Sequence, residues 1–416
     1  MVRDFLPDGP QMQGHMLLTT RAQAPGGIAD VITIEKMGKE EGVQFLLKRV
    51  KKSAHSASER AAAEAIVAEL DGFPLALDQA GAYVEETGCS LAHYLKFYQT
   101  HRKELLRRRG RLVNDYPETV ATTWDISLKK VEQTNSAAVA LLKLCAFLAP
   151  DAIHEEMFIT GALFLKQELL TVFGDEKLLN EAIGTLWQYS LVRRNPEAKT
   201  LSMHRLMQVV LKDGMSREEQ LLWAKNALLV VGEAFPYGKY GNWEQCRRYL
   251  PHAQICLELI RQYGMDGGAA AYLLFNVGHY FYEQGEYKRA EECYLHRLRI
   301  CQALFGMAHS ETVKMLNILG NLSLDQDHYG QAEGYYKQAL SIAESIYGIA
   351  HPSTAGALHA LGRLSREQGK YGQAEWYFKQ ALSLINHFYM NYESSLIFEK
   401  AWKPRKEGNP PKSRED

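Results

Sequence analysis

The most telling absence in the 416 residues is that of a long apolar run. A helix that crosses a bilayer needs about 20 consecutive apolar residues, and no stretch of this chain approaches that length. The N-terminal residues, MVRDFLPDGP, also lack the apolar segment of a secretory signal peptide. We therefore expect a soluble cytoplasmic protein with no membrane partner.

An imbalance of charge is lacking as well. The chain has 48 lysines and arginines against 49 aspartates and glutamates, which gives a net charge of -1. A nucleic-acid-binding domain usually carries a clear basic excess. The densest basic stretch, RKELLRRRGR at 102–111, is more typical of the solvated end of a helix than of a phosphate-binding patch. We expect no nucleic acid among the partners.

Cysteine is scarce and follows no metal-binding pattern. The six cysteines include no C-x-x-C pair and belong to no His/Cys cluster with the spacing of a zinc site. His154-Glu155-Glu156 lacks the second histidine of a zinc-binding helix, so we interpret it as solvated surface. We expect buried free thiols, as in a reducing compartment, and no metal site.

Against these absences stands a strong internal repeat in the C-terminal half. Three segments, which begin at Asn276, Ile318 and Ala360, align at a constant offset of 42 residues. The positions that are identical in all three are Gly278, Gly320 and Gly362; Gln284, Gln326 and Gln368; Tyr287, Tyr329 and Tyr371; Ala290, Ala332 and Ala374; Glu291, Glu333 and Glu375; and Leu298, Leu340 and Leu382. Composition alone does not produce such identity.

Each copy has the pattern of two amphipathic helices. We expect the repeated glycine and alanine where two helices approach closely, and the repeated tyrosine at the start of the second helix. The sequences between copies, LFGMAHSET and IYGIAHPST, each combine a helix stop with a helix start. The predicted caps are Gly306 and Gly348 at the C-termini, and Ser310 and Ser353 or Thr354 at the N-termini.

These features resemble the tetratricopeptide repeat, which has a glycine in its first helix and small residues in its second. The 42-residue unit with Gly-x-x-His-Pro is similar to the repeats of kinesin light chains. The resemblance covers residues 268–390. It implies a right-handed solenoid with a concave groove, because no single unit can bury its apolar face alone. Degenerate helices at 216–235 and 243–263 are expected to cap the stack.

Helix geometry indicates which side chains face the groove. They lie three residues before, one after and four after the repeated glycine of each first helix. The residues predicted there are His279, Tyr282, Asn317, Asn321, His359, Arg363 and Arg366. Such side chains form hydrogen bonds with an extended backbone and with acidic groups, so we expect a protein or peptide ligand. The alternative is an exposed polar face that binds nothing.

Upstream of the repeats, the sequence predicts a winged helix. The expected elements are a helix with a short strand at 178–194, a turn at 195–199, a strand at 200–204, and earlier helices at 121–131 and 138–153. A DNA-reading winged helix needs a basic recognition helix. The candidate at 176–189 has one lysine against two glutamates. A transcription regulator with a repeat sensor is therefore the least favoured alternative.

Four segments, in this order, resemble bacterial signalling NTPases of the NB-ARC (STAND) class: HMLLTTR, the strand and helix of VITIEKMGKEEGVQFLLKRV (31–50), GFPLAL and SMHRL. The resemblance implies that Arg21 senses a γ-phosphate, that Pro74 packs on adenine, and that His204 donates to the β-phosphate of ADP. Arg205 stands where the class has an aspartate, which puts the acidic contact of that position in doubt. From the residues alone, Pro74 also fits a helix entry and His204 a helix cap.

The phosphate-binding half of such a site is missing from the sequence. No segment fits G-x-x-x-x-G-K-[ST], and no apolar strand with an acidic end precedes Arg21 to hold Mg²⁺. This pattern is typical of an N-terminally truncated member of the class. We therefore expect no enzymatic activity and no bound cofactor. ADP or ATP would bind only if a partner chain with a P-loop completed the pocket.

Together these patterns predict a mainly α fold. The expected segments are a remnant of a nucleotide-binding sheet at 1–37, a helical subdomain at 38–112, a winged helix at 113–213, linking or capping helices at 214–265, an array of three repeats at 266–390, and a disordered tail at 391–416. The favoured hypothesis is an interaction scaffold or sensor joined to the regulatory part of a signalling NTPase that lacks its P-loop. The alternative is half of a split ATPase switch that binds ADP or ATP together with a partner chain.

Overall fold

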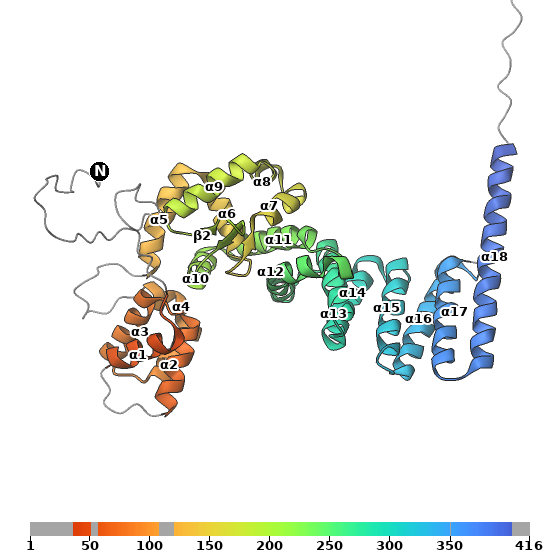
Figure 1. Ribbon diagram of the computed structural model, residues 1–416, viewed down its shortest axis with the longest axis horizontal. Coiled ribbons are helices and arrows are strands. Elements are labelled where there is room, and N and C mark those ends of the chain that lie inside the picture. The colour runs from red at the N-terminus through yellow and green to blue at the C-terminus, as the bar shows by residue number, and fades with distance from the viewer. Residues whose placement is uncertain (1–35, 51–56, 108–119, 350, 402–416) are drawn as a thin grey trace, which may run out of the picture. The chain divides into compact units, whose positions relative to one another are not determined.

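The computed structural model describes residues 36–50, 57–107, 120–349 and 351–401. Contacts divide the chain into two compact units, of which the first comprises 1–236 and 244–265 and the second 237–243 and 266–416. Both consist almost entirely of helices, as Figure 1 shows, so the predicted mainly α fold is confirmed. Arg21 and the predicted strands before residue 36 lie outside the described residues.

Four helices open the first unit: α1 (Lys39–Arg49), α2 (Ala57–Glu69), α3 (Pro74–Thr87) and α4 (Leu91–Arg107). Their apolar faces meet in one core around Leu46, Ile66 and Leu77, each at most 1% exposed. Burial of each such side chain stabilises the fold by about 2 kcal/mol. Arg49 pairs with Asp78 at 2.9 Å and also with Glu85, which ties α1 to α3.

The next segment of the first unit combines helices with a small sheet. Its elements are α5 (Val120–Thr134), α6 (Ser136–Cys145), β1 (Ile153–His154), α7 (Glu155–Gly161), η2 (Ala162–Phe164), α8 (Gln167–Phe173), α9 (Glu176–Gln188), β2 (Arg193–Asn195), β3 (Thr200–Ser202) and α10 (Arg205–Gly214). β3 pairs antiparallel with both neighbours, and Leu201 lies opposite Ile153 and Arg194. The predicted order of helix, strand, turn and strand is confirmed.

One expectation for this segment is wrong, and a second is confirmed only in part. The helix predicted at 138–153 ends at Cys145, because the chain turns through Pro150 and a left-handed Ala152 (φ 52°) before β1 begins. His154-Glu155-Glu156 is solvated surface only in part, since Glu156 is exposed and His154 is half-buried. Glu155 is buried and accepts two hydrogen bonds from Arg194 at 2.7 and 2.8 Å, while Glu156 accepts one from Tyr249.

Two long helices complete the first unit: α11 (Arg217–Ala234) and α12 (Trp243–Tyr263). The short η3 (Tyr240–Asn242) lies between them in the chain but belongs to the second unit. Ser216 and Glu219 form a capping box at the start of α11, and this helix packs against α6 and α7. Both helices were predicted. Their contacts group α11 and all but the first residue of α12 with the first unit. Among the described residues, no helix is long and apolar enough to cross a membrane.

Apart from residues 237–243, the described part of the second unit consists of three successive helical pairs, visible as a row in Figure 1. They are α13 (Gly268–Glu283) with α14 (Tyr287–Phe305), α15 (Ser310–Leu324) with α16 (Tyr329–Tyr347), and α17 (Pro352–Glu367) with α18 (Tyr371–Ala401). We refer to α13, α15 and α17 as the A helices and to α14, α16 and α18 as the B helices. Each repeated tyrosine opens a B helix, as predicted.

The repeated glycine is required by close packing, which confirms the prediction. A methyl group added at Gly278, Gly320 or Gly362 would lie 2.8, 2.3 or 2.6 Å from an aromatic ring of the B helix in the same pair (Tyr294, Tyr336 or Phe378). The repeated alanine is at most 4% exposed in every copy. The missing glycine side chain therefore leaves the space that this ring fills.

The caps between repeats agree with the sequence only in part. Gly306 and Gly348 end their helices with φ of 87° and 77°, as predicted. The predicted serine and threonine N-caps are wrong. His309 and His351 are the N-caps of α15 and α17, because each imidazole Nδ1 accepts a hydrogen bond from the backbone N–H two residues later.

Candidate functional site

A cleft of about 330 Å³ lies between the turn that precedes α3 and the start of α10 in the first unit. Its walls include the side chains of Lys36, Asp71, Phe73, Trp124 and His204. The turn adopts its shape because Asp71 and Gly72 are left-handed (φ 50° and 64°), and because a side chain at Gly72 would clash with the Met37 carbonyl oxygen. Local backbone conformation therefore carries Asp71 and Phe73 into the cleft.

His204 connects β3 to α10 and has two different ring nitrogens. Nδ1 accepts a hydrogen bond from the Leu206 N–H at 3.2 Å, which makes His204 the N-cap of α10. The neutral ring consequently carries its proton on Nε2. That nitrogen is buried, lies 3.7 Å from the Asp71 carboxylate, and has no hydrogen-bond partner among the described residues. Burial lowers the pKa of His204, although Asp71 acts in the opposite direction.

Aromatic rings form the apolar wall of the cleft. The Phe73 ring meets His204 edge-on at 4.9 Å and Trp124 at 5.3 Å between centroids. Pro74 lies next to this wall as the first residue of α3, the position at which proline favours a helix start. The structure thus brings the Pro74 segment to His204, whereas Arg21 lies outside the described residues.

Charged side chains line the rim. Lys36 pairs with Asp71 at 2.8 Å, and Arg193 and Asp151 also line the cleft. An N–H group beside apolar rings and cations can donate a hydrogen bond to an anion, while the apolar rings pack on a planar group that carries this anion. Sequence reasoning missed Trp124 and Asp71. Trp124 lies in the helix predicted at 121–131, to which no binding role was given, and the Asp71-Gly72 dipeptide, which is typical of a turn, was the available signal for Asp71.

The second candidate site is the A-helix face, the side of the second unit lined by α13, α15 and α17. Asn321 and Arg363 occupy the same position of successive repeats, and Arg363 Nη1 lies 3.4 Å from Asn321 Oδ1. The same oxygen accepts a hydrogen bond from the Tyr336 hydroxyl at 2.8 Å. Tyr282 donates to Asp325, which joins α13 to α15 in a similar way.

The first repeat carries an aromatic stack on this face. His279 stacks on Tyr237 at 4.2 Å and lies 6.0 Å from the Tyr282 ring. Burial lowers the pKa of His279, with Glu283 opposing the shift. Sequence reasoning missed Tyr237, which precedes the repeats. Its neighbour Gly238 fits tightly against the Tyr280 backbone, where a side chain would approach to 2.6 Å, so this short segment packs closely on α13.

The remaining predicted groove residues are not drawn into one constellation. The buried Asn317 Oδ1 has no hydrogen-bond partner among the described residues. His359 is exposed and faces Phe378 at 5.2 Å. Arg366 pairs with the adjacent Glu367 at 2.9 Å and lines a hollow shared with α18. The geometry therefore joins Asn321 to Arg363 and His279 to Tyr282, and places Arg366 beside α18.

Two sequence families match parts of this chain. Residues 311–386 match the tetratricopeptide repeat, and residues 129–220 match a domain of unknown function, DUF7779. The match to DUF7779 begins within α5, includes α6 through α10 and ends in the first residues of α11. The described residues contain no cluster of three or more histidine, cysteine or acidic side chains that could hold a metal ion.

A curated relative is a nucleotide-binding leucine-rich repeat (NLR)-like protein of Hyaloscypha variabilis, which is 28% identical over 320 residues. The match covers 73% of this chain but only 31% of that protein. Among solved structures, BtubC (BKLC) from P. vanneervenii is 15% identical and covers 71% of this chain and 95% of its own, with a TM-score of 0.34. Kinesin light chain TPR-like repeats from Podosopora anserina are 13% identical and cover 54% of this chain and 95% of their own, with a TM-score of 0.35.

The repeat pattern, the helical pairs and the family match agree on one statement. The chain is a mainly α protein whose C-terminal part consists of tetratricopeptide repeats.

Proposed function

We propose that this protein is an interaction scaffold whose A-helix face binds a segment of another polypeptide. The observation that carries the proposal is the polar link between successive A helices. Arg363 and Asn321 meet on this face, while the neighbouring glycines make the packing contacts with the B helices. The Arg363 guanidinium uses one N–H group for the Asn321 oxygen and retains others that can donate to a carboxylate or a backbone carbonyl.

The test compares two double variants of the full chain. Asn321→Ala/Arg363→Ala removes the link on the A-helix face. Glu333→Ala/Lys337→Ala removes an exposed ion pair of 2.6 Å on α16 and serves as the matched control. Proteins captured from a lysate are quantified by mass spectrometry for wild type and both variants.

A specific partner should fall by about ten-fold or more with the first variant, because each lost charged hydrogen bond costs about 1.5–3 kcal/mol. Its recovery should be unchanged with the control. Equal recovery with all three proteins would remove the A-helix face from the function. Circular dichroism checks that both variants remain helical.

A second candidate function, a nucleotide-responsive switch, is supported by the cleft around His204. The donor at Nε2, the Phe73 and Trp124 rings and the nearby cations suit a base and one phosphate contact. The sequence offers no glycine-rich phosphate loop, so the residues present fit only part of an adenine nucleotide. On this proposal a partner chain with a P-loop supplies the rest.

Calorimetry with ADP separates these ideas. The chain alone should bind ADP with a Kd of about 1 mM or weaker, because most phosphate contacts are missing. Micromolar one-to-one binding would show that a nucleotide site is complete within the chain. If saturating ADP changes the histidine NMR signals of wild type no more than those of His204→Gln, the switch proposal is wrong.

A further inference from the structure

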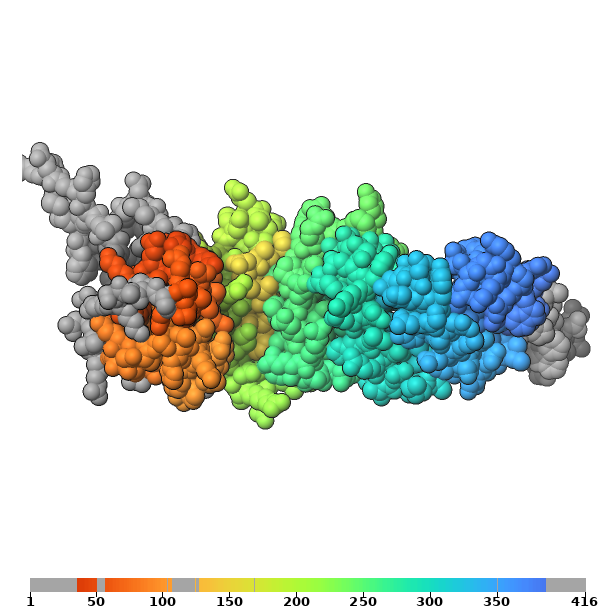
Figure 2. All heavy atoms as spheres, turned by 90° about the horizontal axis from the view of Figure 1, so that it is seen from below, coloured from red at the N-terminus to blue at the C-terminus, as the bar shows by residue number. Residues whose placement is uncertain are grey.

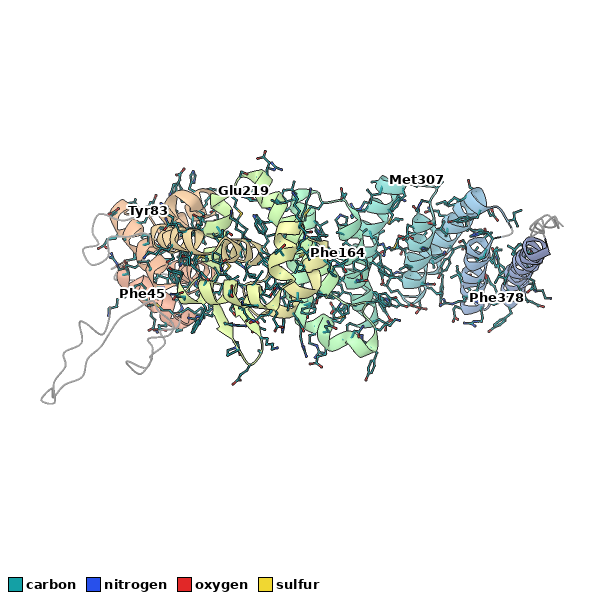
Figure 3. All side chains as sticks on the ribbon, turned by 90° about the horizontal axis from the view of Figure 1, so that it is seen from above. Phe45, Tyr83, Phe164, Glu219, Met307 and Phe378 are labelled. Carbon is teal, nitrogen blue, oxygen red and sulfur yellow. The ribbon has the colours of Figure 1, made fainter. Side chains whose placement is uncertain are left out.

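The B helix of the last repeat, α18, exposes an apolar stripe. Tyr371 is 72% exposed, Leu382 59% and Ile385 36%. A hollow of about 370 Å³ runs along this stripe and is lined by Tyr371, Ala374, Phe378 and Leu382, with Arg366, Glu375 and Lys379 at its rim. Figure 3 labels Phe378 on α18, and Figure 2 shows this helix in blue at the end of the repeat row.

The 42-residue register shows what such a hollow accommodates. The equivalents of its four apolar residues on α16 are Tyr329, Ala332, Tyr336 and Leu340. Those four residues form one apolar cluster with Ala360, Leu361 and Leu364 of α17. Tyr336 is fully buried there, whereas its equivalent Phe378 is only half-buried. On α16 these positions form a socket that Ala360, Leu361 and Leu364 of α17 fill. The hollow on α18 is the equivalent socket, and no described helix fills it.

The stripe on α18 also contains a sequence pattern similar to the one with which α17 fills the socket on α16. Ala360-Leu361-x-x-Leu364 of α17 corresponds to Ala381-Leu382-x-x-Ile385 of α18. Ala381 is buried against α17, but Leu382 and Ile385 point outward. One helix therefore presents both a socket and the side chains that suit it.

The order of residues along α18 also favours pairing with itself. Tyr371 and Ile385 are equally distant from Phe378, and so are Ala374 and Leu382. In an antiparallel pair of α18 helices centred on Phe378, Leu382 of one chain meets Ala374 of the other, and Ile385 meets Tyr371. Large side chains then lie against small or flat ones, as an isologous interface requires. Glu375 and Lys379 pair within their own helix at 2.6 Å, so neither charge needs a new partner.

We propose that a second copy of this chain docks on α18 and forms a two-fold dimer through the stripe Tyr371, Ala374, Phe378, Leu382 and Ile385. The interface lies on a B helix and is distinct from the A-helix face. A single helix pair is a small interface, so the dimer should have a Kd of about 1–100 µM.

Sedimentation equilibrium on the full chain, between about 1 and 200 µM, tests the dimer across the expected affinity range. The mass should rise from 47.1 kDa toward twice that value. Leu382→Glu should abolish the rise, because it places a charge against the partner's Ala374. Leu163→Glu is the control, since Leu163 is 75% exposed but lies in η2 of the first unit.

Cross-linking in a Cys89→Ser background tests the antiparallel arrangement. Residues 371 and 385 lie about 21 Å apart along one helix, too far for a disulfide within a chain. Tyr371→Cys/Ile385→Cys should therefore give a covalent dimer on oxidation, and Tyr371→Cys alone should not. A monomer at the highest concentration, a dimer that survives Leu382→Glu, or cross-linking of the single variant would each overturn the proposal.

Discussion

At the residue scale, histidine caps helices, a role that the sequence predicted for His204 but not for His309 and His351. His204, His309 and His351 each cap a helix by accepting a backbone N–H at Nδ1. A neutral imidazole can do this because one ring nitrogen keeps a free lone pair. The other nitrogen is then available for different contacts, as Nε2 of His204 is in the cleft.

The cap at His309 should be measurable. We expect His309→Ala to lower the free energy of unfolding of the repeats by about 1 kcal/mol, and His309→Asn to keep most of it, because asparagine is a good N-cap. Urea unfolding followed by circular dichroism measures both. His328 also precedes a helix, but its side chain makes no cap hydrogen bond. If His328→Ala costs as much as His309→Ala, capping is not the reason.

His252 should make the first unit sensitive to acid. It is fully buried, Nδ1 accepts from the Ala149 N–H at 3.2 Å, and Nε2 lies 3.0 Å from the Ala152 carbonyl oxygen. Burial lowers the pKa of His252 to about 4. The pKa of a histidine in the unfolded chain is about 6.5. Between about pH 4 and pH 6.5, His252 is therefore protonated in the unfolded chain but neutral in the native state.

The contribution of the neutral His252 to the free energy of unfolding is therefore fully present above pH 6.5. It is lost as the pH falls toward 4, and the total loss is about 3 kcal/mol. His252→Gln should remove this share of the pH dependence, since glutamine does not titrate and can both donate and accept. Chemical denaturation of wild type and variant between pH 4 and 7 measures the difference. Parallel pH profiles for the two proteins would contradict the assignment.

At the scale of the element, the helical pair depends on one missing side chain. The Tyr336 ring fills the space above Gly320, where a methyl group would lie 2.3 Å away. The ring is held in place because its hydroxyl donates to Asn321. The packing residue and the polar residue of the A-helix face are thus neighbours that share one tyrosine.

We expect Gly320→Ala to destabilise the repeats by about 1–3 kcal/mol, because the crowded ring must shift. Gly334→Ala is the matched control within the same helical pair. Nothing lies within 4 Å of a methyl group at that exposed helical position, and alanine should stabilise the helix by up to about 1 kcal/mol. Thermal unfolding of the two variants should shift in opposite directions, and a neutral Gly320→Ala would show that the pair is loosely packed.

At the scale of the whole molecule, the chain has two sets of contacts rather than one core. The small sheet, the cleft and α12 from Glu244 onward belong to the first unit, and the three repeats belong to the second. Contacts within a unit make unfolding cooperative, whereas separate sets can unfold separately.

Scanning calorimetry should therefore resolve two transitions in the full chain. His252→Gln should shift one of them and Gly320→Ala the other, because these residues belong to different units. A single transition that both variants shift by the same amount would mean that the two units unfold together.

What the sequence determined by itself is the repeat array. The 42-residue period, the glycine that accepts a ring and the tyrosine that opens each B helix are set by contacts within one helical pair or with the next one. Such contacts join residues that are close in the chain, so a pattern in the sequence reveals them. The left-handed glycine caps were predictable for the same reason.

Only the tertiary structure decided which distant groups meet. Asp71, Phe73 and Trp124 surround His204 because a turn, a helix start and a strand end pack together from separate stretches of the chain. Glu155 was predicted to be solvated, yet it is buried because Arg194 reaches it across the small sheet. Burial and partner choice depend on long-range packing, which no local pattern encodes, so the environment of each histidine and carboxylate became visible only in the folded chain.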